Sequence, residues 1–577
     1  MNSQELEHYR HSLAHLLAAA VLEMYPDAKR TIGPAIEDGF YYDFEFPTPI
    51  SETELPKIEK RMRKILTTWK GFERIDVTAD EARKEFASNP YKTELINEFS
   101  KDGQNLTFYK SGNYVDLCRG GHIENPKDID PEAFKLTKLA GAYWRGDEKN
   151  AQLTRIYGVA FATKEELEAH LTMLEEAKKR DHRKLGKELG LFTFSELVGP
   201  GLPLWTPKGT LVRELLNDFV WDLRRVHGYQ KVTVPHITKK ELYETSGHWA
   251  KYAADLFKIN TREGHMFAMK PMNCPHHAQI FDSQPHSYRD MPVRYCETTM
   301  VYRDEQSGEL SGLQRVLCIT QDDAHVFCRM NQVRDEAEKV WDIIAKFYQT
   351  FGFTLKPRLS RRDPAQAEKY MGEPADWDKA EAALKEILVD HKQEWIDGLG
   401  EAAFYGPKID FMAKDSLGRT WQVATIQLDF NQPRNFGLTC VNEVGEKEPV
   451  LMVHCAIMGS IERFMSVLIE HYAGAFPMWL APEQIRLATV ADGFIPFAAE
   501  LKAKLERVGL RVQLDDSNEK VGKKIRNAAI EKTPWTIVIG EKEVAGEDLQ
   551  VKVFGTDEVL VVKQSDLITE ALRVSGR

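Results

Sequence analysis

Apolar residues recur along this chain at two spacings, one typical of helices and one typical of strands. They follow the helical period in His11–Leu22, and again in Lys164–Gly190, a segment rich in Glu, Lys, Leu and Ala. We expect a helix at the first and one long linking helix at the second. From about residue 481, short apolar stretches at Ile485–Val490, Leu510–Leu514 and Thr536–Ile539 alternate with helical ones, which predicts a small α/β unit with parallel strands.

The pattern from residue 301 to residue 325 predicts a hairpin, because β-forming residues flank turn residues at 306–308 and 311–312. Side chains two residues apart on a strand share a face. Arg303 and Glu305 would therefore present a cation suited to phosphate beside a carboxylate that can accept an amine proton. On the second strand the alternating polar residues are Gln321, Asp323 and His325. A solvated strand face would give the same alternation, so this pattern alone leaves the function open.

Length, charge and cysteine usage bound the class of protein. A chain of 577 residues exceeds one hydrophobic core and predicts three or four domains. The net charge of −11 argues against a globally basic nucleic-acid coat but not against local basic faces. Seven scattered cysteines, an odd number, indicate reduced thiols and a cytoplasmic protein. We find no apolar run of membrane-spanning length and no secretory signal, so we expect no membrane partner.

Two pairs of potential metal ligands lie within the first 160 residues. His11 and His15 are one helical turn apart, and Cys118 and His122 have the same spacing. Together the pairs could form a four-ligand zinc site, although each pair alone is more often a packed or surface pair. The spacing does not decide between these alternatives.

The segment His454–Phe464 is the feature that points to a family. With the hairpin at 301–316 it resembles motifs 3 and 2 of class II aminoacyl-tRNA synthetases, and Gln321–His325 resembles the threonyl-specific enzymes. This resemblance covers nearly the whole chain. It implies an α+β multidomain protein with a class II antiparallel-sheet catalytic core, an N-terminal editing domain and a C-terminal α/β anticodon-binding domain. The expected boundaries are 1–163 for the editing domain, 164–190 for the linker helix, 191–480 for the catalytic domain and 481–577 for the anticodon-binding domain.

The resemblance implies ATP-dependent activation of threonine to threonyl-adenylate and its transfer to tRNA(Thr). Arg303 on the α-phosphate and Arg463 on the opposite side of the nucleotide are the expected catalytic residues, with Mg²⁺ bridging phosphates. Attack by the threonine carboxylate needs positioning and charge neutralisation more than acid–base groups. The residues expected to bind ATP are Arg303, Glu305, Gln314, Val316, Gln422, Thr425, Ser460 and Arg463.

The resemblance also implies one zinc ion per subunit, held by Cys274, His325 and His454, a set too widely spaced for spacing alone to predict. Three protein ligands leave an open position on the ion. An apolar pocket separates a methyl from a hydroxyl by only about 10²-fold, whereas a site that ligates the hydroxyl rejects valine far better. Serine carries the same amino and hydroxyl groups and is therefore also accepted by such a site. A second, hydrolytic site is then required to remove serine from mischarged tRNA. The residues expected to bind threonine are Gln321, Asp323, Tyr405, Lys408 and Gln427, with Asp323 as acceptor.

The first 160 residues resemble the editing domain shared by threonyl- and alanyl-tRNA synthetases, where a His-x-x-x-His pair is followed distantly by Cys-x-x-x-His. The resemblance implies hydrolysis of mischarged seryl-tRNA, and we rank a metal-free site above a zinc site here. Lys92 and His11 would activate or position water and stabilise the developing charge. The other residues expected to line this pocket are His15, Tyr42, Asp116, Cys118 and His122.

Three further segments bear on partners. Gly228–Pro235 resembles motif 1, which implies a homodimer, although by itself it would indicate an edge strand stopped by proline. Asn518 and Glu543 are the expected anticodon contacts. The basic run Lys178–Lys184 is either a solvated face or a tRNA contact. The resemblance begins almost directly at the editing helix, so we expect the family's small ubiquitin-like domain to be missing here.

The sequence departs from the family pattern at four places. Ile319 stands where an aromatic residue would lie under adenine, which keeps apolar contact and loses stacking. Cys455 stands in place of an arginine after the zinc histidine, and Ser517 stands where arginine is common. Lys552–Phe554 replaces an Arg-x-Arg pattern. These departures bear on ATP affinity and anticodon contacts rather than on the reaction class.

Two alternative functions follow from the same residues. One is a non-catalytic, synthetase-like RNA-binding regulator, against which the retained Arg303, Glu305 and Arg463 argue. The other is a sister synthetase for proline or serine, which the absence of bound zinc would favour.

Overall fold

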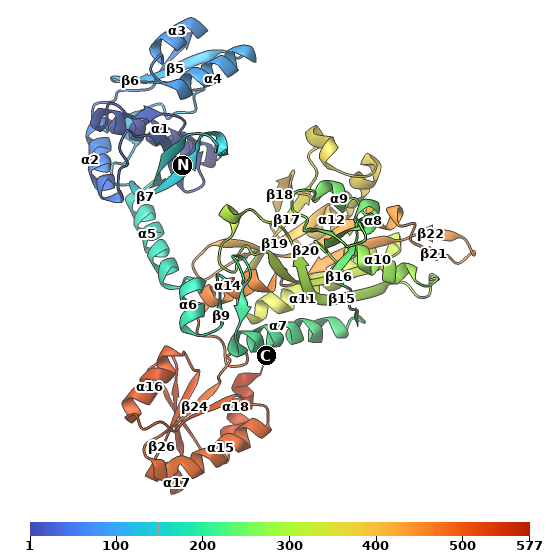
Figure 1. Cartoon of the computed structure of the whole chain (residues 1–577). Helices are drawn as coiled ribbons and strands as arrows, with labels where there is room; N and C mark the ends of the chain where they lie inside the picture. The colour runs from blue at the N-terminus through green and yellow to red at the C-terminus, as the bar shows by residue number, and fades with distance from the viewer. Residues whose placement is uncertain (148, 577) are drawn as a thin grey trace. The chain divides into compact units, whose positions relative to one another are not determined.

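The computed structural model describes residues 1–147 and 149–576. The chain forms two compact units, Met1–Glu176 and Ala177–Arg577. Helix α5 (Lys164–Lys179) contains the boundary between them (Figure 1). Among the described residues, no helix combines the length and the apolar character needed to cross a lipid bilayer.

The first unit is organised on helix α1 (Ser3–Met24), which confirms the predicted helix and extends it at both ends. Asn2 caps α1 by accepting from the backbone N–H of Glu5. With α2 (Leu55–Leu66), α1 packs against an antiparallel sheet, and a smaller sheet follows with α3 (Ala79–Glu85) and α4 (Pro90–Lys101). The strands of the first sheet are β1 (Lys29–Arg30), β2 (Ala35–Ile36), β3 (Gly39–Glu45), β7 (Phe134–Tyr143) and β8 (Gln152–Ala160). Those of the second are β4 (Glu73–Val77), β5 (Leu106–Ser111) and β6 (Tyr114–Leu117).

The prediction of one continuous linking helix is wrong. Helix α5 ends at Lys179, and a second helix, α6 (His182–Glu188), begins after Asp181. The Asp181 side chain accepts from the backbone N–H of Arg183 at 2.8 Å and caps α6. Because an N-cap residue has non-helical backbone angles, the cap ends the preceding helix. The residues on both sides of the break are mostly charged and favour helix, so the sequence pattern does not indicate where the first helix ends.

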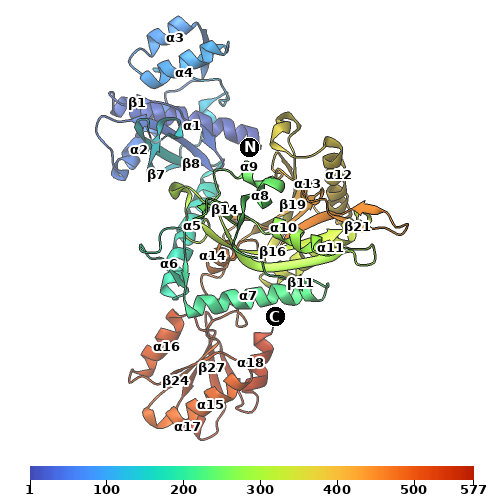
Figure 2. The same ribbon diagram turned by 45° about the vertical axis from the view of Figure 1, so that its right-hand side comes forward.

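The second unit contains an eight-stranded sheet in the order β11-β15-β16-β23-β20-β19-β17-β18, antiparallel except for the pairs β11–β15 and β17–β18. Helices α7 (Pro207–Arg225), α11 (Val333–Thr350) and α14 (Ile461–His471) share one core with it, and α7 and α11 run along one side (Figures 1 and 2). The strands are β11 (Gln230–Lys231), β15 (Val293–Tyr302), β16 (Cys318–Cys328), β17 (Thr354–Arg361), β18 (Ile396–Leu399), β19 (Lys408–Lys414), β20 (Thr420–Asp429) and β23 (Leu451–Ala456).

The predicted hairpin is confirmed in its pairing but not in its length. Strands β15 and β16 pair antiparallel, with Tyr302 opposite Cys318. Because β15 ends at Tyr302, Arg303 and Glu305 lie in the connecting segment, and the prediction that they share a strand face is wrong.

The last part of the chain is an α/β unit with a mixed sheet. Strands β24 (Ile485–Thr489), β25 (Val512–Asp515) and β26 (Trp535–Ile539) are parallel, as predicted. Strands β27 (Leu549–Val553) and β28 (Val559–Val562) add antiparallel pairs that the sequence did not reveal. The surrounding helices are α15 (Ile495–Arg507), α16 (Val521–Ile530), α17 (Glu541–Val544) and α18 (Leu567–Ser575) (Figure 1).

Candidate active site

Strand register places predicted zinc and threonine residues in one row across the large sheet. His325 on β16 lies opposite His454 on β23, His454 lies opposite Gln427 on β20, and Gln427 lies opposite Lys408 on β19. Directly paired residues of neighbouring antiparallel strands point to the same face. The alternation therefore leaves Ala324 and Val326 in the core, while these four polar side chains converge on the other face.

Three buried ligands meet at one end of this row. Cys274, the first residue of α10 (Cys274–Asp282), contributes a sulfur that lies within 4.8 Å of one ring nitrogen each of His325 and His454. His277 Nδ1 lies 2.8 Å from His325 Nδ1, and Asp429 Oδ2 lies 3.0 Å from His454 Nε2. The buried Nε2 of His325 has no hydrogen-bond partner among the described residues. We call Cys274, His325 and His454 the catalytic cluster.

The electrostatics of the catalytic cluster fit a divalent cation. Burial raises the pKa of the Cys274 thiol and that of the Asp323 carboxyl group, so their anionic forms need a nearby positive charge. Burial lowers the pKa of His325, which keeps the imidazole in the neutral form that binds metals. One sulfur and two imidazoles, with ring partners outside the cluster, are a ligand set that suits Zn²⁺.

A cavity of about 530 Å³ opens beside the catalytic cluster. Every residue predicted to bind ATP or threonine lines it, and so do Ile319 and Cys455. The sequence did not single out Tyr252, which also lines the cavity and whose ring centroid lies 5.7 Å from the Arg303 guanidinium carbon. The structure thus brings together residues from seven separate segments of the chain around one space.

Asp410 on β19, which was not among the predicted site residues, organises the polar wall of this cavity. Its buried carboxylate accepts from Gln422 Nε2 at 2.8 Å and from Thr425 Oγ1 at 2.9 Å, and it lies 2.8 Å from Lys408 Nζ. Three predicted residues are thus oriented by one anion. The sequence could have indicated Asp410, because it follows the predicted residue Lys408 by two positions and so lies on the same strand face.

Helix α14 begins at Ile461, and the Ser460 side chain caps it by accepting from the backbone N–H of Arg463 at 3.2 Å. The segment before it is held by buried Asp322, which accepts from the backbone N–H groups of Ile457 and Met458 at 2.8 Å each. Arg224 forms an ion pair with the same carboxylate. Motif 3 is therefore fixed to the strand that carries Asp323 and His325.

In the first unit the two predicted ligand pairs also meet, with one potential ligand atom from each of the four residues within 4.8 Å of the others. The Cys118 sulfur lies 3.4 Å from His122 Nε2 and 3.5 Å from His11 Nε2. Residues 118–122 form a loop after β6, so the helical spacing suggested for this pair is wrong, although the side chains are neighbours. We call His11, His15, Cys118 and His122 the N-terminal cluster.

A buried ion pair lies in the same unit. Lys92 Nζ is 2.7 Å from Asp116 Oδ1 and 3.4 Å from Tyr42 Oη, whose hydroxyl donates to Asp116. Arg30, which was not predicted, lies 3.4 Å from the same carboxylate. Burial would raise the pKa of Asp116, but the Lys92 and Arg30 cations hold it well below its ordinary value. Burial lowers the pKa of His15 to about 3, so its imidazole is neutral.

The two predicted anticodon contacts follow parallel strands. Asn518 lies in the loop after β25 and Glu543 in α17 after β26. Both strands pair with β24 in parallel, so their carboxyl ends share one edge of the sheet. Ser517 lies beside Asn518 on this edge, where its hydroxyl donates to Asp515 at 2.6 Å.

Comparison with known proteins identifies the family. Residues 257–472 match the tRNA synthetase class II core domain (G, H, P, S and T), 484–573 the anticodon binding domain, and 106–157 the threonyl and alanyl tRNA synthetase second additional domain. The threonine–tRNA ligase of Gloeobacter violaceus is 49% identical over 560 residues, which cover 95% of this chain and 89% of that relative. The chain belongs to the threonine–tRNA ligase family. The family member from Deinococcus radiodurans is 47% identical over 575 residues, 98% of this chain and 88% of its own.

Solved structures agree with this membership. A crystal structure described as the RNA binding domain of threonyl-tRNA synthetase from Cryptosporidium parvum has a TM-score of 0.65 at 34% identity, covering 68% of this chain and 98% of that one. A prolyl-tRNA synthetase from Giardia lamblia shares the fold, with a TM-score of 0.56 at 15% identity over 70% of this chain and 80% of its own. The predicted family, the class II fold and the enzyme class of the threonine–tRNA ligases are confirmed.

Proposed function

We propose that this chain is a threonine–tRNA ligase that forms threonyl-adenylate from threonine and ATP, transfers threonine to tRNA(Thr) and hydrolyses mischarged seryl-tRNA. One observation carries the proposal. In a member of this family, the residues expected for both small substrates line one cavity beside a buried Cys/His₂ cluster.

In the activation step, ATP occupies the cavity with Arg303 on the α-phosphate and Arg463 on the opposite side, and Mg²⁺ bound with the nucleotide would supply further charge neutralisation. A carboxylate oxygen of threonine attacks the α-phosphorus, and pyrophosphate leaves with the electron pair of the broken bond. Glu305, Gln314, Val316, Gln422, Thr425 and Ser460 contribute position, and the arginines neutralise charge. The terminal ribose hydroxyl of tRNA then attacks the acyl carbon, and AMP leaves.

Selection of threonine rests on the catalytic cluster and on the polar side chains along its row. Cys274, His325 and His454 would hold one Zn²⁺, which when bound recognises the amino and hydroxyl groups of the substrate. Asp323 accepts a hydrogen bond from the substrate, and the Asn273 amide, which donates to Asp323 Oδ2 at 3.0 Å, orients it. Valine lacks the hydroxyl and leaves buried polar groups unpaired, which is the strongest basis for rejection. The remaining residues proposed to contact threonine are Gln321, Tyr405, Lys408 and Gln427.

Hydrolysis of seryl-tRNA is assigned to the first unit without a metal. Lys92 and His11 position a water and stabilise the charge that develops on the carbonyl oxygen of the ester; serine is released and the ribose oxygen of tRNA leaves as a hydroxyl group. His15, Tyr42, Asp116, Cys118 and His122 shape the pocket. Burial lowers the pKa of His11, which supports this assignment because a neutral imidazole can accept a proton from water. The ion pair with Asp116 holds the Lys92 ammonium group in place.

The wider organisation is also proposed. We infer a homodimer formed through 228–235, supported by the position of β11 at the edge of the large sheet. Asn518 and Glu543 contact the anticodon, and the domain boundaries fall at 163/164, 190/191 and 480/481. A cytoplasmic setting is supported by seven cysteines that all carry free thiols.

Pyrophosphate exchange with threonine, serine and valine, followed by aminoacylation and metal analysis, tests this function. We expect exchange with threonine, weaker exchange with serine, and background exchange with valine. A non-catalytic RNA-binding regulator would bind tRNA without any exchange. A synthetase for serine or proline would prefer its own amino acid and contain no zinc.

A further inference from the structure

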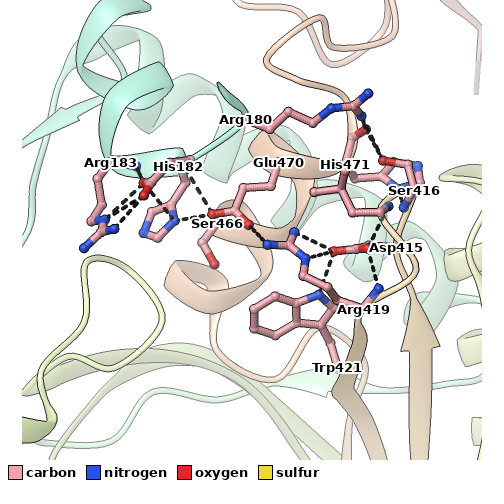
Figure 3. A network of polar contacts seen from close by, with 12 residues as sticks. Arg180, His182, Arg183, Asp415, Ser416, Arg419, Trp421, Ser466, Glu470 and His471 are labelled. Carbon is pink, nitrogen blue, oxygen red and sulfur yellow. Dashed lines mark hydrogen bonds and ion pairs between the residues drawn. The ribbon is translucent and has the colours of Figure 1, made fainter. Parts of the chain in front are cut away.

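The junction between α5 and α6 contacts two parts of the candidate active site. His182, the first residue of α6, is buried. Its Nε2 accepts a hydrogen bond from the backbone N–H of Leu313 at 3.1 Å, and its Nδ1 lies 2.6 Å from Oε1 of Glu470 near the end of α14 (Figure 3). One imidazole therefore links the loop 311–316, which we call the ATP loop, to the helix that carries Arg463.

The two partners fix the tautomer of His182. A backbone N–H only donates and a carboxylate only accepts, so Nδ1 carries the proton and Nε2 the lone pair. Burial would raise the pKa of Glu470, but hydrogen bonds from His182 and the charge of Arg419, whose Nη1 lies 2.6 Å from Oε2, hold it below its ordinary value. Arg419 also pairs with Asp415 in the turn between β19 and β20 (Figure 3). The imidazole thus sits in a network with defined donors and acceptors.

This network is a hydrogen-bonded link rather than a metal site. Asp181, His182 and Glu470 do bring potential ligand atoms within 4.8 Å of one another. Both ring nitrogens of His182 already have protein partners, however, and both oxygens of Glu470 face donors or a cation. Asp181 is engaged by Arg183, whose Nη2 lies 2.6 Å away.

Besides the bond to His182, the ATP loop is held through two arginines, Arg463 and Arg315, and Arg315 also lies 3.0 Å from Glu309, a side chain that is not assigned to ATP. Arg463 Nε donates to the Gln314 carbonyl at 3.3 Å, and Arg315 Nη2 lies 2.7 Å from Glu305. Each of these contacts involves an exposed arginine, and Arg463 and Glu305 are side chains that the proposed function assigns to ATP. The bond from Leu313 to His182 is buried and uses no side chain assigned to a substrate.

Gly312 shows how closely the ATP loop approaches the imidazole. Its φ is +49°, and a Cβ atom at this position would lie 2.3 Å from His182 Nε2. The sequence therefore pairs a glycine with the histidine at the point of contact. Gly312→Ala should separate the loop from the ring without altering the ring itself.

We propose that His182 is a positioning residue for ATP: its imidazole holds the ATP loop on α14 while Arg463 and Glu305 turn to the nucleotide. This inference rests on the proposed role of the ATP loop, which carries Gln314 and Val316. It also relates the break between α5 and α6 to the site, because His182 is the first residue of the new helix and its ring contacts both the ATP loop and Glu470.

Two substitutions separate the halves of the link. His182→Asn keeps an amide that can donate to Glu470 but is too short to reach Leu313. His182→Gln can present its amide oxygen to Leu313. In threonine-dependent pyrophosphate exchange we expect His182→Asn to raise the KM for ATP about 5- to 10-fold, the factor for one lost hydrogen bond. The KM for threonine should stay within about twofold, because none of the residues assigned to threonine lies in the ATP loop, and His182→Gln should recover part of the ATP affinity.

Arg180→Ala is the matched control at the same junction. Arg180 Nη1 donates to Ser416 Oγ at 3.1 Å and to the His471 carbonyl at 3.4 Å, both outside the ATP loop (Figure 3). This change should leave the KM for ATP unaltered. Gly312→Ala should raise the KM for ATP. The double variant with His182→Asn should have a KM for ATP no higher than that of the single variant with the larger increase, because both changes remove the same contact.

Several results would overturn the inference. They are an unchanged KM for ATP in His182→Asn, an equal rise for threonine and ATP together with a lower thermal unfolding midpoint, or additive effects in the double variant. Failure of the proposed function is distinguishable, because the unaltered chain would then show no threonine-dependent exchange before any variant is made.

Discussion

The two cysteine–histidine clusters of this chain have similar composition and different surroundings. The catalytic cluster is fully buried, and its histidines contact His277 and Asp429, which lie outside it. The N-terminal cluster is buried only at His15, and Cys118 contacts His11 and His122 within the cluster. Potential metal ligands therefore lie close together in both clusters, but the groups that surround the two clusters differ.

Those surrounding groups assign different chemistry to the two clusters. Carboxylates adjoin the catalytic cluster, since Asp429 contacts His454 and Asp323 Oδ1 lies 3.7 Å from His325 Nε2. Such anions favour a bound cation. In the first unit burial is the main cause that disfavours a positive charge on His15; the Asp116 carboxylate favours one, and the cations Lys92 and Arg30, which pair with Asp116, oppose it. We therefore expect zinc at the catalytic cluster and none at the N-terminal cluster, and this contrast can be tested.

The largest expected effect is that of Cys274→Ala. Removing one of three ligands should abolish bound zinc and lower threonine-dependent pyrophosphate exchange by about 10³-fold or more. Metal analysis and exchange assays measure both. Cys118→Ala makes the same change in the N-terminal cluster and should leave zinc content and exchange intact. Zinc lost from Cys118→Ala and kept in Cys274→Ala would reverse the comparison.

Lys92→Met should affect only the hydrolytic reaction. We expect hydrolysis of seryl-tRNA to slow about 10²-fold, the usual cost of losing a positioned acid–base group, while charging with threonine is unchanged. Deacylation of preformed seryl-tRNA measures the effect, and a thermal melt reports the cost of leaving Asp116 buried without its partner. Lys101→Met, an exposed lysine on the same helix α4, is the control. Equal losses in both variants would contradict the assignment.

His277→Phe should weaken the catalytic cluster without removing a ligand. His277 Nδ1 lies 2.8 Å from His325 Nδ1 and so orients the His325 ring. Without this contact we expect the affinity for zinc to fall about 10- to 100-fold. Competition with a chelating dye gives this affinity. The adjacent His276→Phe is the control, since neither His276 nitrogen has a hydrogen-bond partner among the described residues. The same loss in both would mean that packing, and not orientation of His325, matters.

The smallest effect concerns pH and the N-terminal cluster. The pKa of His15 is lowered by burial to about 3, whereas the pKa of a histidine in the unfolded chain is ~6.5. Between these values the unfolded chain binds the additional proton, so stability present above pH ~6.5 is lost as the pH falls. His15 should cost about 1.4 kcal/mol of unfolding free energy between pH 7.5 and pH 5.5. Hydrogen exchange of the α1 amides, measured in urea at several pH values, tests this. His15→Phe should reduce the dependence of the unfolding free energy on pH.

The sequence predicted much of the site because some of its geometry is local. A strand has a period of two, so the alternation in 321–325 was enough to place Gln321, Asp323 and His325 on one face. Segments whose end is set by a turn or a cap were predicted less well. Strand β15 ends before Arg303, and Asp181 interrupts a run of helix-forming residues.

By itself the sequence determined the composition of each cluster, the faces of single strands and, through motif resemblance, the family. Only the tertiary structure decided that His325 lies opposite His454, that Asp410 joins three side chains of one wall, and that His182 contacts the ATP loop. The physical reason is that register and long-range hydrogen bonds depend on how separate strands and helices pack together, and no local period in the chain encodes that.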